Sequence, residues 1–184
     1  MLLPDDAFRA SAPRELTTTG KLTVAALALY LIASLPMWLW VLADGATGQF
    51  RLLATIGVPV ITDAEAVQLV KLAYFAAVGG AVGGVTFGMM NLQRHATVGS
   101  FRPVFAGDYL FRPFGASALA MVVFALARGG VLTVLGVDAA AGSATVGSRL
   151  SSLGIGFLVG FASVAVVRSL TKLAGRTFGG EREE

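Results

Sequence analysis

The stretch from Leu22 to Ala43 most constrains this chain, because none of its 22 consecutive residues is charged. A helix rises about 1.5 Å per residue, so this stretch can cross a hydrocarbon core of about 30 Å. Cleavage as a signal peptide is the alternative, but the apolar part of a signal peptide usually spans only about 7–15 residues. Pro36 lies inside the stretch and should kink the helix. The sequence therefore predicts a first transmembrane helix at about 22–43.

The chain as a whole carries too few charges for a soluble domain. Its residues are 55% hydrophobic and 14% charged, with a mean hydropathy of +0.76, whereas a soluble domain has about 25% charged residues. The 23 glycines suit helices that approach closely in lipid. We therefore expect an all-α, polytopic membrane protein with four transmembrane helices in a bundle.

Several kinds of site are excluded by residue content. The chain has no cysteine and His95 is its only histidine, so disulfides, cysteine-ligated metals and histidine clusters cannot form within one chain. The net charge is +3, but the basic residues stand singly at predicted helix ends, whereas a nucleic-acid-binding surface gathers them on one face. The sequence predicts no metal, no other cofactor and no nucleic-acid partner.

The second and fourth spans are bounded by capping and charged residues. Thr62 as N-cap and Glu65 three residues later fit a capping box, which would start the second helix before its membrane span at about 70–93. Arg149 and Arg168 bound an apolar run that predicts a fourth span at about 150–168.

The third span, at about 113–135, is predicted to begin at Pro113, because proline is favoured in the first turn of a helix. Arg112 would then anchor the helix at the membrane surface. Only 15 residues separate Arg112 from Arg128, which is short of a full crossing. Either Arg128 snorkels within the outer leaflet, or the helix stops there and residues 131–137 form a separate interfacial piece.

Small residues recur at helical spacing in two of the predicted spans. In lipid, such faces let another helix backbone come close and gain van der Waals and Cα–H···O contacts. The spacing does not distinguish a partner helix in the same chain from one in another copy. The predicted helix-packing residues are Gly79, Gly80, Gly83, Gly84, Gly88, Gly156 and Gly160.

The distribution of basic residues predicts the topology. A polar arm (1–20), the connection between the second and third spans, and a charged tail (176–184) flank or interrupt the transmembrane domain at 21–175. The side that includes both termini carries ten Lys and Arg, and the other side four. By the positive-inside rule both termini are cytoplasmic, and we expect the protein in the cytoplasmic (inner) membrane of a bacterium.

Four segments resemble a bacterial family of small four-helix membrane proteins. They are GGAVGG (79–84), YLFRPFGASALAMVVFALARGGVL (109–132), LGIGFLVGF (153–161) and VVRSLTKLAG (166–175). The family carries Tyr-Leu-x-Arg-Pro-x-Gly-Ala, a later Arg-Gly-Gly and a final Phe-Leu-x-Gly-Phe. The resemblance covers about 70–175 and implies the four-helix topology, but no activity. Residues 160–163 read Gly-Phe-Ala-Ser, where the family often has serine and a charged residue after Gly-Phe, which leaves the role of this segment open.

Three arginines are candidates for contact with an anion or a lipid headgroup. A charge within a span is costly, so Arg128 could bind such a group or pair with Asp138; the alternative is a snorkelling helix end. Arg102 and Arg112, in matched Phe-Arg-Pro contexts, could form an anionic-lipid site at the inner surface or serve as ordinary anchors.

No Asp or Glu lies within the predicted spans, and no nucleophile–base pair or nucleotide-binding loop is present, so we do not expect an enzyme. Three functions remain. The protein self-associates or acts as a membrane subunit of a larger complex; it forms a homo-oligomeric channel or small-solute pore; or it binds or carries lipid through the arginines. Its expected partners are the lipid bilayer and further copies or other membrane subunits.

Overall fold

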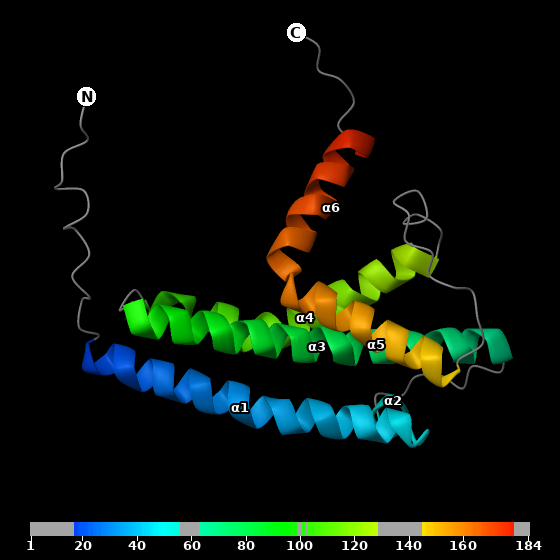
Figure 1. Ribbon diagram of the computed structural model, residues 1–184, viewed down its shortest axis with the longest axis horizontal. Coiled ribbons are helices and arrows are strands. Elements are labelled where there is room, and N and C mark those ends of the chain that lie inside the picture. The colour runs from blue at the N-terminus through cyan, green and yellow to red at the C-terminus, as the bar shows by residue number, and fades with distance from the viewer. Residues whose placement is uncertain (1–16, 56–62, 99–100, 102, 129–144, 179–184) are drawn as a thin grey trace, which may run out of the picture.

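The computed structural model describes residues 17–55, 63–98, 101, 103–128 and 145–178, with side chains up to Lys172. Every regular element in these ranges is a helix (Figure 1). Most of the predicted arm, residues 131–137 and the end of the tail lie outside the described residues. The helices are α1 (Thr18–Ala46), α2 (Arg51–Thr55), α3 (Ala64–Val98), the 3-10 turn η2 (Pro103–Phe105), α4 (Ala106–Arg128), α5 (Val146–Phe161) and α6 (Ser163–Phe178).

Three of these helices, α1, α3 and α4, are long and apolar enough to cross a membrane, with 29, 35 and 23 residues. Together α5 and α6 also have the length and hydropathy of a span, but they are bent by 86°. The described residues therefore contain three candidate spans, or four if the bent pair is one span. These helices indicate a membrane protein, and the all-helical class predicted from the sequence is confirmed.

The bundle is built around α3, which packs against α1, α4 and α5. In the most apolar 18-residue stretch of α3, 67% is buried inside the bundle, compared with 22% in the corresponding stretch of α1 and 28% in that of α4. In Figure 1, α1, α3 and α4 run roughly along one direction, whereas α6 points away from the bundle. Thus α3 is the core helix, and α1 and α4 turn large apolar faces outward.

Polar caps set the first residues of three helices. The Thr17 Oγ1 atom accepts a hydrogen bond from the Gly20 amide at the start of α1, and Thr145 caps α5 in the same way. At the start of α3 the Asp63 carboxylate accepts from the Glu65 amide at 3.0 Å. The predicted cap residue Thr62 lies outside the described residues, and Asp63 caps a helix that begins at Ala64.

The prediction that the third helix begins at Pro113 is wrong. That helix begins at Ala106, directly after η2, and Pro113 lies fully buried inside it. The proline of the first Phe-Arg-Pro, Pro103, therefore opens the helical segment, and the second proline is accommodated within the packed bundle. With 23 residues, α4 is about 35 Å long, enough for a crossing that ends at Arg128 without residues 131–137.

The fourth predicted span, at about 150–168, is not one straight helix. Helix α5 ends at Phe161, where the Ala162 amide still bonds to the Leu158 carbonyl, and α6 starts at Ser163 in a new direction. The 16 residues of α5 reach only about 24 Å. Sharp kinks occur at Gly and Ser pairs, and Gly160 and Ser163 flank this one.

Candidate functional site

The glycines of α3 and α5 allow these two helices to touch backbone to backbone. A Cβ atom built on Gly79 would overlap the carbonyl oxygen of Leu153, and one on Gly83 would overlap that of Phe157. The contact is reciprocal, because a Cβ on Gly156 would overlap the Ala76 carbonyl oxygen. A Cβ on Gly160 would in turn overlap the Gly80 carbonyl oxygen. No larger residue fits this contact without separation of the helices.

A second face of α3 meets α4 through alanines. A Cβ on Gly80 would lie 2.5 Å from the Ala120 Cβ and 2.6 Å from the Ala116 carbonyl oxygen. A Cβ on Gly84 would lie 2.6 Å from the Ala116 Cβ. Gly88 differs, since a Cβ there would make only an ordinary contact at 3.5 Å with Leu31 of α1. The predicted packing glycines of α3 therefore lie against three helices of the same chain, α1, α4 and α5.

Arg112 lies inside α4 and not at its start, contrary to the anchor predicted from the sequence. Its guanidinium carbon stacks 4.2 Å from the centroid of the Phe87 ring, and its Nε is buried without a hydrogen-bond partner among the described residues. Phe87 in turn packs edge-on against Phe161 at the end of α5, with centroids 5.7 Å apart. Arg112 thus joins α3 and α4 beside the bend between α5 and α6.

Arg128, the second candidate arginine, does not join Arg112 in one site. Arg128 is the last residue of α4, with its guanidinium carbon 5.8 Å from the Phe124 ring centroid. It lies 16 positions after Arg112, which is about 24 Å along the helix. Arg102 and Asp138 lie outside the described residues. The structure therefore contains no shared anion site formed by these predicted arginines within its described part.

An aromatic cluster that the sequence did not predict lies where α1, α2 and α3 meet. Phe50 packs edge-on against Tyr74 and Phe75, at 5.3 and 6.4 Å between ring centroids. Phe50 has a φ of 48°, a left-handed conformation that costs energy for a non-glycine residue. Its ring contacts offset that cost. The Tyr74 hydroxyl donates to the Val41 carbonyl at 2.6 Å, which ties α3 to α1.

Two cations border the aromatic cluster of Phe50, Tyr74 and Phe75. The Lys71 Nζ lies 5.6 Å from the Phe50 centroid, and the Arg149 guanidinium carbon lies 5.9 Å from the Phe75 centroid. The nearby carboxylate of Asp44 accepts from the Arg51 amide at 2.7 Å and lies 3.9 Å from the Arg51 Nε. In the sequence, Arg149 had indicated only the start of the fourth span.

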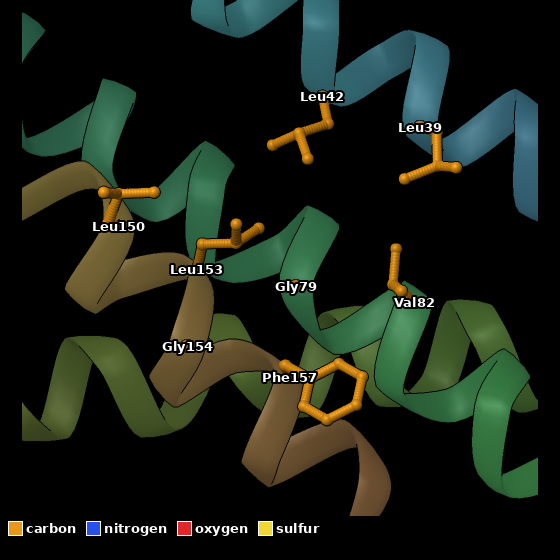
Figure 2. A pocket seen from close by; sticks show the side chains of 8 residues that line it. All are labelled: Leu39, Leu42, Gly79, Val82, Leu150, Leu153, Gly154 and Phe157. Atoms are coloured by element: carbon orange, nitrogen blue, oxygen red, sulfur yellow. The ribbon is translucent and has the colours of Figure 1, made fainter. Parts of the chain in front are cut away.

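An apolar groove with a volume of about 370 Å³ lies between α1 and α5 and is also lined by residues of α3. Figure 2 shows two leucines of α1 on one side of the space, with side chains of α5 on the other. The groove is partly open to the outside of the bundle. The lining residues are Leu39, Leu42, Gly79, Val82, Leu150, Leu153, Gly154 and Phe157.

The described residues contain no group of three or more His, Asp or Glu side chains that could hold a metal ion. No family model matches the chain, and no curated protein or solved structure shows significant similarity to it. The resemblance to small four-helix membrane proteins therefore stays a prediction. The arrangement offers close helix packing, an exposed amphipathic helix and an apolar groove with cations near one end.

Proposed function

We propose that the protein is a non-enzymatic integral membrane protein that self-associates or serves as a membrane subunit of a larger complex. The observation that carries this proposal is α6, which leaves the bundle at an angle of 86° to α5. Most of its described side chains are exposed, including Val164 and Val167 at 48% and 50%. A helix turned away from its own bundle is available to another subunit.

Helix α6 is strongly amphipathic. Val167 and Leu170, three residues apart, lie on one side. Arg168 and Lys172, four residues apart, lie on the other, and Val164 lies at the edge between the two sides. Amphipathic helices of this kind bind partners by laying the apolar side into a groove. We therefore assign the apolar side of α6 to a protein contact and its basic side to the membrane–water boundary.

We further propose four crossings, with α5 and α6 as a bent fourth span and both termini in the cytoplasm of a bacterium. The excess of Lys and Arg in the segments on that side supports this orientation. The channel alternative has less support. The glycine faces that would line a pore pack instead against backbone of α4 and α5 within one copy.

The test is the mass of the full chain in lipid nanodiscs, together with any subunit that purifies with it. We expect a discrete oligomer or a defined complex, which Val164→Ser combined with Val167→Ser dissociates. Val122→Ser is the matched control, because Val122 is 51% exposed and belongs to α4, not to α6. A monomer without co-purifying protein, or an assembly that resists the α6 variant, would refute the proposal.

A further inference from the structure

The groove between α1 and α5 has the size and lining of a binding site for an apolar chain. Its volume of about 370 Å³ is more than twice that of the apolar cavities of about 150 Å³ that bind benzene. Every residue that lines it is glycine or hydrophobic. The groove opens between α1, a candidate membrane span, and α5, which together with α6 has the length and hydropathy of a span. The solvent around such helices consists of acyl chains.

Gly154 keeps this space open from the α5 side. A Cβ built on Gly154 would have no neighbouring atom within 4 Å, in contrast to those on Gly156 and Gly160. Leu150, in the preceding turn of α5, is 62% exposed beside it. Helix α5 therefore packs closely on α3 through one face and presents a second, unfilled face toward α1.

The end of the groove near Arg149 is positively charged. Lys71, Phe75, Gly79 and Val82 recur at spacings of four, four and three residues, so they follow one face of α3 from the cations into the groove. Arg149 immediately precedes the groove residue Leu150, and its guanidinium stacks on Phe75.

Neither cation is neutralised by a carboxylate of a described residue. Among the described residues, Lys71 and Arg149 form no ion pair, and the Arg149 Nε is buried without a hydrogen-bond partner. The carboxylate of Asp44 accepts a hydrogen bond from the Arg51 amide and forms an ion pair with the Arg51 side chain. The first turn of α5, which holds Arg149, contains no acidic residue to offset the positive end of the helix dipole.

We infer that this groove binds one acyl chain of a phospholipid whose phosphate lies beside Arg149. Guanidinium groups bind phosphate oxygens with strong, charge-assisted hydrogen bonds. From Arg149 to Phe157 α5 advances eight residues, about 12 Å along the helix, so a chain held at its phosphate by Arg149 can follow the lining leucines. Lys71 adds positive charge at the same end. The site does not depend on the partner proposed for α6.

Binding is measured by native mass spectrometry of the delipidated full chain in detergent, titrated with phosphatidylglycerol or with diacylglycerol of the same chains. Gly154→Leu should fill the groove and weaken binding of both lipids at least about tenfold, because several buried methylene contacts are lost. Gly115→Leu is the matched control, since a Cβ on Gly115 also meets nothing within 4 Å but Gly115 does not line the groove. It should leave binding unchanged.

Arg149→Gln tests the phosphate contact separately. It should weaken phosphatidylglycerol roughly tenfold and leave diacylglycerol unchanged, because only the former carries the phosphate. Arg149→Lys should restore part of the loss, and Arg168→Gln on exposed α6 is the control for net charge. Circular dichroism of each variant verifies the helical fold.

Three results would overturn the inference. Equal binding by Gly154→Leu and Gly115→Leu would show that lipid does not use the groove. A phosphatidylglycerol affinity unaffected by Arg149→Gln would remove the headgroup site. An oligomer that Gly154→Leu converts to monomer would mean that a helix of a second copy, and not a lipid, fills the groove.

Discussion

Replacing Gly80 by alanine tests the close contact between α3 and α4. The added methyl group would lie 2.6 Å from the Ala116 carbonyl oxygen and 2.5 Å from the Ala120 Cβ. Neither neighbour is the end of a flexible side chain, so relief requires movement of a helix. To lengthen the 2.6 Å contact to an ordinary distance near 3.4 Å, α3 and α4 must move apart by roughly 0.8 Å. A gap of about 0.5–1 Å between the two helices already loses a quarter to a half of the van der Waals attraction between their facing atoms.

Overpacking of this kind typically costs about 1–3 kcal/mol. Gly115→Ala on α4 is the matched control, because its methyl group meets nothing within 4 Å. That control should be neutral or more stable by up to about 1 kcal/mol, the usual helical advantage of alanine over glycine. We therefore expect Gly80→Ala to be less stable than Gly115→Ala by about 2 kcal/mol.

The measurement is reversible unfolding of the full chain in mixed micelles with increasing dodecyl sulfate, followed by tryptophan fluorescence. Gly88→Ala provides an internal scale, since its methyl group would make only ordinary contacts with Leu31. It should behave like Gly115→Ala. Equal stability of Gly80→Ala and Gly115→Ala would refute the backbone-to-side-chain contact on which the packing of α3 against α4 rests.

Three further predictions concern polar contacts and topology. Tyr74→Phe should cost about 1 kcal/mol in the same unfolding assay, because it removes a buried hydrogen bond to Val41, whereas Tyr30→Phe, which loses an exposed one to Leu110, should cost less. Asp44→Ala should speed hydrogen exchange of the Arg51 amide, because it removes the carboxylate that accepts from it, and unchanged exchange would contradict that bond. Because the chain has no cysteine, single-cysteine variants report topology: Thr97→Cys and Thr171→Cys should react with an impermeant maleimide only after cells are opened, and Thr145→Cys in intact cells. The reverse pattern would invert the proposed orientation.

The sequence predicted the helical membrane class because that class depends on the length and hydropathy of each segment alone. It predicted the wrong proline, Pro113, as the start of the third helix, which begins at Ala106 directly after Pro103–Phe105. Both prolines follow Phe-Arg, and the choice depends on the burial of Pro113 beneath Gly84 in the folded bundle. The bend at Ala162 was missed for a similar reason, since the run from Leu150 to Val167 is apolar on both sides of the break.

The groove and its cations could not be derived from spacing. The contact of Arg149 with Phe75 joins residues far apart in the chain, and Phe50 reaches the aromatic cluster from a loop without periodicity. The glycine pattern did carry information, because it picked out residues that the structure places against α4 and α5. The glycine pattern did not predict which helix each glycine contacts, because that depends on how the whole bundle is arranged.

In α5, Gly156 and Gly160 make contacts that build the bundle, whereas Gly154 borders a space that the bundle leaves open. Glycine inside a helix is less favourable than alanine by about 0.5–1 kcal/mol. At Gly156 and Gly160 that cost is offset by contact with the backbone of α3, which a methyl group would prevent. Gly154 has no such contact, so packing within the chain gives no reason for a glycine there; Gly115 shares this feature, but only Gly154 lines the groove. A ligand that needs the surface of α5 to stay open supplies one, which makes Gly154→Leu, rather than a substitution in the packed face, the variant that separates binding from folding.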